Sequence, residues 1–219
     1  VEYDLLLNKQ RQIDAATDTE KHAQYQALLA EMDQLAARMQ NAFYDESDHR
    51  PVGEDEHTLS CRIERIGFQE RLGERSSAID AMQSLLPELD EALGPHHWRT
   101  AEARARLGIW LVRERRYTEA EAALRRSLRG LKSVYGDASI DVLRTATWLS
   151  KALAGQNRHE EERAVFREAF DAARKSGASI DVLKQAASWR ENNLSQRGDA
   201  ETAVWQAEKK ELDKEPGPG

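Results

Sequence analysis

The sequence has few of the residues that cross-link or interrupt a chain, and each shortage excludes a class of structure. Its 219 residues include one cysteine, Cys61, so no disulfide can form within the chain. Only five prolines and 12 glycines occur, which leaves long stretches free for regular secondary structure. No apolar run approaches the roughly 18 residues of a membrane-spanning helix, and no secretory signal is recognisable. We therefore expect a cytoplasmic protein.

Charge and strong helix formers are what the sequence does contain. Charged residues make up 32% of the chain, against about 25% in average globular domains. Ala, Leu, Glu and Arg are frequent, and no alternating strand pattern is evident, so we expect an all-α fold. The formal net charge of −7 argues against a general nucleic-acid binder, because neutralising phosphates needs a basic surface.

Overlaying the chain on itself reveals a repeat. Leu107 falls on Leu149 at a shift of 42 residues. A weaker copy begins at residues 179–183, which repeat residues 139–143 letter for letter at a shift of 40. Self-similarity at a period of roughly 20–50 residues is typical of solenoid architectures.

Each copy of the repeat is predicted to contain two helices. In the clearest copy they cover residues 99–114 and 118–134, where spacings of three, four and seven put apolar residues on one stripe. A break that contains glycine precedes each copy: Gly53, Gly94, Gly136 and Gly177. Glycine at such a place can take the left-handed conformation that ends a helix. Because one helix pair cannot bury its stripe alone, we expect successive pairs to stack.

A specific pattern surrounds the turn inside the repeat. Leu107-Gly108 lies in the first helix, and residues 117–122, Tyr-Thr-Glu-Ala-Glu-Ala, begin the second. This pattern resembles the tetratricopeptide repeat, whose small residues let neighbouring helices approach closely. Residues 93–100, Leu-Gly-Pro-His-His-Trp-Arg-Thr, resemble the punctuation of its kinesin-light-chain-like subgroup, a repeat type that is also widespread in bacterial proteins. The resemblance implies a right-handed superhelical array of antiparallel helix pairs, an α-solenoid.

Two residues depart from the family pattern. Glu162 stands where a small residue is expected in the second helix of the third repeat. Arg190 stands where glycine is expected in the first helix of the fourth. We therefore expect looser packing at both positions.

The resemblance also suggests how the chain is divided. We expect an N-terminal helical region at 1–46, an acidic linker at 47–57, repeats over 58–208 (58–97, 98–139, 140–179 and 180–208) and a disordered tail at 209–219. The N-terminal region carries a heptad-like seam: Leu28, Met32, Leu35, Met39 and Ala42. This seam fits a helix that caps the first repeat, or one that forms a homodimer through residues 20–44.

The first helix of each repeat lines the concave groove in the family that the chain resembles. The positions carried over on that basis are Arg65, Phe68, Glu102, Arg106, Ile109, Arg113, Arg144, Trp148 and Lys151. A tryptophan flanked by basic residues is a reasonable binding hot spot, although Trp148 could instead pack between repeats. The other four tryptophans are expected to be core or inter-helix residues: Trp98, Trp110, Trp189 and Trp205.

One family subsite is not predicted. Chaperone-binding members hold a C-terminal carboxylate with a set of Lys, Asn and Arg, and Phe68 occupies the position of the first Asn. The pair Asn192-Asn193 in the last repeat does not restore that set.

The charge is unevenly placed along the chain. Residues 1–57 carry 13 acidic and five basic side chains, a balance of −8. Residues 98–139 carry 10 basic and five acidic, a balance of +5. A basic middle repeat could attract an acidic peptide, although these arginines could equally pair with neighbouring glutamates.

Motifs for catalysis and for metal or cofactor binding are missing. We find no Cys-x-x-Cys or His-x-x-x-His pair, no Gly-rich phosphate loop and no nucleophile elbow. We therefore predict no enzymatic activity, cofactor or metal. The leading hypothesis is a scaffold that binds a peptide or protein segment in its groove. The alternative is a structural or oligomerising region of a larger signalling protein.

Overall fold

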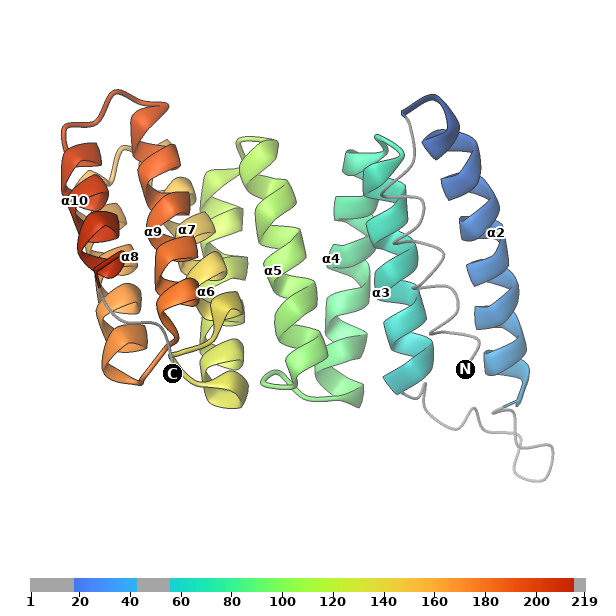
Figure 1. The fold of residues 1–219 in the computed structure, drawn as a ribbon. Coiled ribbons are helices and arrows are strands. Elements are labelled where there is room, and N and C mark those ends of the chain that lie inside the picture. The colour runs from blue at the N-terminus through green and yellow to red at the C-terminus, as the bar shows by residue number, and fades with distance from the viewer. Residues whose placement is uncertain (1–17, 43–55, 215–219) are drawn as a thin grey trace. The chain divides into compact units, whose positions relative to one another are not determined.

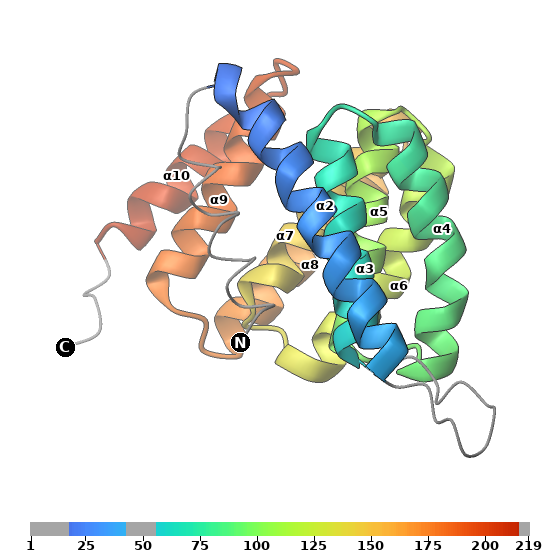
Figure 2. The ribbon, with the colours of Figure 1, turned by 90° about the vertical axis from the view of Figure 1, so that its right-hand side faces the viewer.

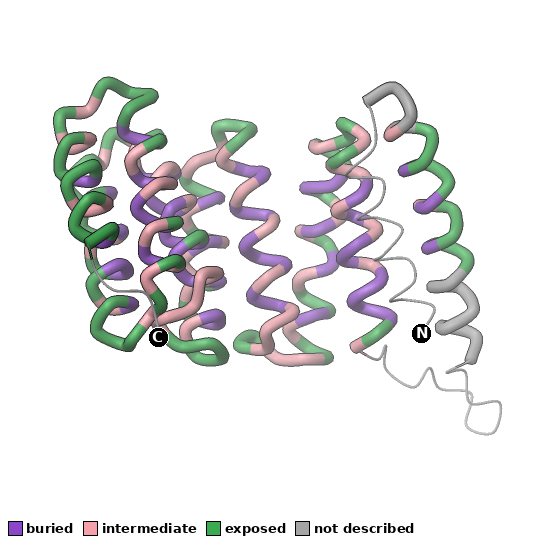
Figure 3. Tube along the Cα trace, in the orientation of Figure 1, coloured by how far each residue is buried: buried purple, intermediate pink, exposed green. Residues whose placement is uncertain are grey.

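The structure is a computed structural model that describes residues 18–42 and 56–214. Within those ranges the chain forms nine α-helices and no strand, so the expected all-α fold is confirmed (Figure 1). The chain divides into two compact units, Val1–Pro95 and His96–Gly219. Figure 3 shows buried positions recurring along each helix, as the apolar stripes of the sequence require. None of the described helices is long and apolar enough to cross a membrane.

The described residues of the first unit, 18–42 and 56–95, form three helices: α2 (Asp18–Ala42), α3 (Glu56–Arg71) and α4 (Arg75–Ala92). Helices α3 and α4 form the first helix pair, and α2 lies along α3 (Figure 2). Leu28 and Met32, two residues of the heptad-like seam, are buried within this unit. The side chains of Leu35, Met39 and Ala42 lie outside the described part of the chain, as do residues 1–17.

The second unit contains three further helix pairs. Their helices are α5 (Trp98–Arg113), α6 (Tyr117–Tyr135), α7 (Ile140–Gly155), α8 (His159–Lys175), α9 (Ile180–Ser195) and α10 (Thr202–Leu212). Each helix packs on the next through α8, and α9 packs on both α8 and α10. The first helices of the pairs are also neighbours, α5 beside α7 and α7 beside α9. This arrangement places one face of α5, α7 and α9 in a row.

Local sequence explains where the helices begin and end. Ser139 and Ser179 cap α7 and α9 by accepting hydrogen bonds from Asp141 N and Val182 N, at 3.2 and 3.3 Å. The glycines that end the pairs have positive φ, as expected: Gly94 (96°), Gly136 (73°) and Gly177 (79°). Helix ends are therefore set by residues that the repeat supplies at fixed positions.

Small residues hold the two helices of the second repeat close together. A side chain on Gly130 would place its Cβ 2.8 Å from Ala101 Cβ, and one on Gly108 would overlap Leu124. The Ser127 hydroxyl donates a 2.7 Å hydrogen bond to the Ala101 carbonyl across the same contact. Large residues here would force α5 and α6 apart.

An aromatic cluster forms the core at the end of the second unit. Trp205 of α10 packs edge-on against Phe166 and Phe170 of α8, with ring centroids 5.0 and 5.1 Å apart. Leu212 is also fully buried in this core. The expected disordered tail from residue 209 is therefore wrong in its boundary, because burying Leu212 extends α10 past 208.

The expected loose packing at Glu162 and Arg190 is also wrong. The two side chains face each other from α8 and α9 and form a buried ion pair. Each of these departures from the family pattern supplies the opposite charge that the other needs when it is buried.

Candidate partner-binding site

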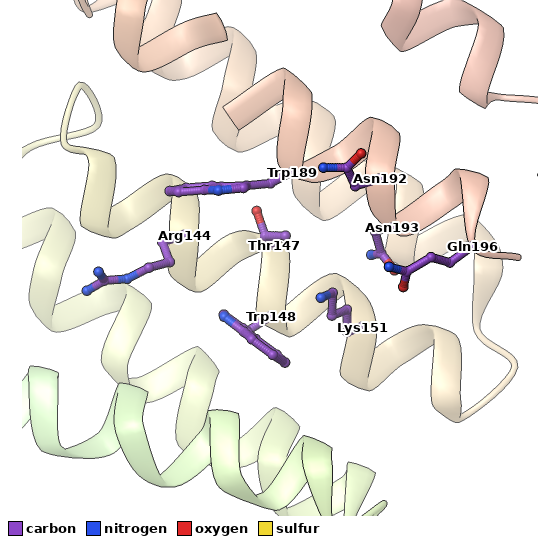
Figure 4. Close-up of a pocket in the computed structure, with 8 residues that line it drawn as sticks. All are labelled: Arg144, Thr147, Trp148, Lys151, Trp189, Asn192, Asn193 and Gln196. Atoms are coloured by element: carbon purple, nitrogen blue, oxygen red, sulfur yellow. The ribbon is translucent and has the colours of Figure 1, made fainter. Parts of the chain in front are cut away.

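Three of the predicted groove residues lie on one face of α7. Arg144, Trp148 and Lys151 are spaced by four and three residues, which aligns them along a helix. Together with residues of α9 they line a pocket of about 250 Å³ (Figure 4). The lining residues are Arg144, Thr147, Trp148, Lys151, Trp189, Asn192, Asn193 and Gln196. Pockets for whole small molecules usually measure about 300–1,000 Å³, so this one suits a few side chains of a larger partner.

Two indole rings form the flat walls of this pocket. Figure 4 shows Trp148 and Trp189 on opposite sides of Thr147. The Lys151 ammonium lies 4.2 Å from the centroid of the Trp148 ring, and the Arg113 guanidinium carbon approaches the same ring at 5.8 Å. Cations over an indole face are attracted by its negative quadrupole. Trp148 thus gathers basic side chains from α5 and α7 around one half-buried ring.

The charge of Lys151 is held in an unfavourable environment. Burial lowers the pKa of its ammonium below 10.5, and the nearby positive charge of Arg113 lowers the pKa further. Both effects disfavour the charged form of Lys151.

Unused hydrogen-bonding capacity also lies in the pocket. Asn193 is 8% exposed, and its Nδ2 has no hydrogen-bond partner in the described part of the chain. Thr147, by contrast, already donates its hydroxyl to the Leu143 carbonyl at 2.8 Å. An unpaired buried donor of this kind costs free energy. The lining set contains two cations and three amides but no carboxylate.

The predicted groove residues of α5 are less tightly grouped. Glu102 lies 3.8 Å from Arg99 on its own helix, and Arg106 and Ile109 are half-buried. Arg113 is exposed and reaches the Trp148 ring. Of this set, Arg113 is therefore the residue that connects α5 to the pocket on α7 and α9.

The two predicted residues of the first repeat both contact α2, and the burial of Phe68 corrects the expected accessibility of that residue. Phe68 is 1% exposed, and its ring lies 5.8 Å from that of Tyr25. Arg65 forms an ion pair with Asp33. Phe68 is closed to a partner in this structure because α2 packs on it, whereas Arg65 is ion-paired but keeps 37% of its side-chain surface accessible.

Trp189 and Asn193 were missed as candidate site residues. Trp189 was predicted to be a core or inter-helix residue. The structure leaves it half-buried at the pocket wall. The signal that could have identified Asn193 was the pair of adjacent asparagines at 192–193, because a polar residue is unusual where a helix buries its apolar face.

No three side chains of the metal-ligating types are grouped within residues 18–42 and 56–214 so as to hold an ion. The site consists of cations, amides and indole rings. Its chemistry is that of recognition by contact and charge.

Comparison with known proteins gives two kinds of similarity. Residues 99–175 match the family model described as tetratricopeptide repeat. BtubC (BKLC) from P. vanneervenii is similar in structure, with a TM-score of 0.60 and 14% identity over 98% of this chain and 91% of that one. A putative kinesin light chain from Podosopora anserina, with nearly identical TPR-like repeats, has a TM-score of 0.69 and 12% identity, over 93% and 94% of the chains. No curated protein matches the sequence.

Proposed function

Because the chain carries tetratricopeptide repeats over residues 99–175, a fold that generally mediates protein–protein interaction, we propose that it binds a segment of another protein. The segment lies along the row formed by α5, α7 and α9. The observation that carries this proposal is the pocket between Trp148 and Trp189. Rigid aromatic walls give a large contact area at low entropic cost, and interfaces concentrate their energy at such residues.

The bound segment is acidic in this proposal. Arg144 and Lys151 line the pocket and Arg113 lies beside it, whereas no carboxylate lines it. Arg144 also forms a 2.7 Å ion pair with Asp141 of its own helix, for which a bound carboxylate would compete. Charge complementarity of this kind mainly selects the partner and speeds association.

The test compares the chain with a variant whose pocket is disabled. The wild type and Arg113→Glu/Trp148→Ala are used as baits in lysate of the source cell, and bound proteins are identified by mass spectrometry. A partner retained by the wild type and lost by the double variant supports the proposal. Arg129→Glu, an exposed charge reversal on α6, is the matched control and should retain that partner.

A partner retained equally by all three baits would show that the row of α5, α7 and α9 is not its binding site. Synthetic peptides tiling the captured partner then locate the bound segment, and isothermal titration measures its Kd. We expect Trp148→Ala to weaken binding by about 2 kcal/mol, roughly 30-fold, as for a hot-spot residue.

A further inference from the structure

In the first unit, helix α2 covers one face of α3. Tyr25, Leu28 and Met32 of α2 are spaced by three and four residues and form one buried stripe on α3. The stripe meets Cys61 and Phe68 of α3, which are each 1% exposed. The face of α3 therefore recognises an amphipathic helix through a narrow apolar seam.

Charge defines the orientation of that helix. Asp33, directly after the last stripe residue, forms an ion pair with Arg65. Both partners are partly exposed, with 47% and 37% of their side-chain surface accessible. A pair at the edge of an apolar contact contributes little affinity but favours one register over others.

The same repeat positions are not covered in this way elsewhere. Arg65 and Phe68 correspond, at a shift of 41 residues, to Arg106 and Ile109 of α5. Ile109 is half-buried, whereas Phe68 is almost completely buried; Arg65 and Arg106 are both half-buried. What distinguishes α3 is thus the helix laid on it rather than the position within the repeat.

The attachment of α2 is one-sided. Away from the stripe, Gln24 and Ala27 are exposed, whereas Leu29 beside it is half-buried and packs against the same apolar cluster. Among the described elements of its own unit, α3 is the helix with which α2 makes its extensive contact. A helix held by one stripe opens at lower free energy than a helix packed on two sides.

We propose that the α3 face is a receptor for an amphipathic helix and that α2 is its resident, exchangeable occupant. The helix that it accepts carries an aromatic residue, then aliphatic residues three and seven positions later, followed by a carboxylate. A partner helix with this pattern competes with α2 for the face. The proposal concerns the first unit and is independent of the pocket on α7 and α9.

Cys61 provides a built-in probe of this exchange. It is the only cysteine of the chain, and it lies beneath the α2 stripe at 1% exposure. Its reaction with a thiol reagent in the folded, full-length chain therefore reports whether α2 is in place. The rate is measured for the wild type, for Met32→Ala and for Tyr25→Ala/Met32→Ala.

We expect labelling to accelerate about tenfold or more in each variant, since truncating a buried anchor removes much of the contact. An excess of a synthetic peptide of residues 18–42 should restore protection. The same peptide with Leu28→Asp should not protect, and one with Asp33→Lys should protect less. Stronger protection by the native peptide than by either altered peptide supports an exchangeable helix.

Leu85→Ala in α4 is the matched control for stability, because it removes a buried side chain of the same unit away from α2. Its labelling should follow global unfolding and be insensitive to the peptide. The proposal is overturned if the peptide fails to protect the variants. It is equally overturned if all variants are labelled only at the rate of global unfolding measured in urea.

Discussion

The guanidinium of Arg190 and the carboxylate of Glu162 form an ion pair in which the side chains are 1% and 0% exposed. Glu162 also accepts a hydrogen bond from Arg197 at 3.1 Å, and Arg190 donates one to Glu201 at 3.3 Å. The Arg190 guanidinium carbon lies 5.5 Å from the centroid of the Phe166 ring. A charged network thus joins α8, α9 and the start of α10, where the family pattern would place small residues.

Breaking this pair from one side should be costly. Arg190→Met leaves the Glu162 carboxylate buried with less compensation, and we expect a loss of about 3–5 kcal/mol in the free energy of unfolding. Glu162→Leu/Arg190→Met replaces both charges by apolar side chains of similar size. We expect this double variant to lie within about 1 kcal/mol of the wild type.

Urea denaturation of the single and double variants measures both values. A double variant as unstable as Arg190→Met alone would contradict this account, because it would mean that the charges stabilise the fold beyond filling space.

The turn inside each helix pair needs one residue with positive φ. The equivalent positions are Gly73, Arg115, Asn157 and Gly198. Arg115 has φ of 59°, a conformation that costs a side-chain-bearing residue roughly 1–2 kcal/mol. Since glycine loses about 0.5–1 kcal/mol of extra freedom on folding, Arg115→Gly should stabilise the chain by about 0.5–1 kcal/mol.

Thermal unfolding can detect this gain. Asn157→Gly is the matched comparison and should gain less, because asparagine enters the left-handed region more readily. A destabilising effect of Arg115→Gly would mean that contacts of the Arg115 side chain outweigh its backbone strain.

Glu121 should make the second unit sensitive to acid. Burial raises the pKa of its carboxyl, but hydrogen bonds from Gln156 and Arg125 and the charges of Arg125 and Arg158 outweigh burial. Its folded-state pKa therefore lies below 4.5, and its stabilising contribution is present above that pH and lost as pH falls through the folded value.

The stability of the wild type should consequently fall more steeply below about pH 4.5 than that of Glu121→Gln. Urea unfolding at a series of pH values between neutral and acidic checks this difference. Parallel curves for the two proteins would exclude a special role for Glu121.

Binding of an acidic segment should depend on the charge of Lys151. Because burial and Arg113 lower the pKa of this ammonium, it loses its proton at a lower pH than an ordinary lysine. A bound carboxylate would raise that pKa, so affinity should be greatest at neutral pH and decline as pH rises through it.

Titrations of the captured peptide at increasing alkaline pH measure this decline. Lys151→Arg should keep its affinity to higher pH, whereas Lys151→Gln should bind weakly and show a flatter profile. Lys175→Gln, an exposed residue at the end of α8, should behave like the wild type. An unchanged profile in Lys151→Gln would place the titrating group elsewhere.

The sequence by itself determined the repeat and its helix pairs. Apolar spacing of three, four and seven residues is a local property of an α-helix, so residues 99–134 predict two helices without knowledge of the rest of the chain. Gly94, Gly136 and Gly177 end the pairs for an equally local reason, their freedom at positive φ. Arg144, Trp148 and Lys151 could be placed on one face because helix geometry fixes their relative directions.

Which residues meet across helices depends on tertiary packing. Glu162 and Arg190 each looked like a defect in its own repeat, and only packing of α8 against α9 makes them partners. Trp189 and Asn193 enter the pocket because α9 lies beside α7, and Phe68 is closed off because α2 lies on α3. Such contacts join residues far apart in the chain, and local periodicity carries no information about which distant side chain will cover which face.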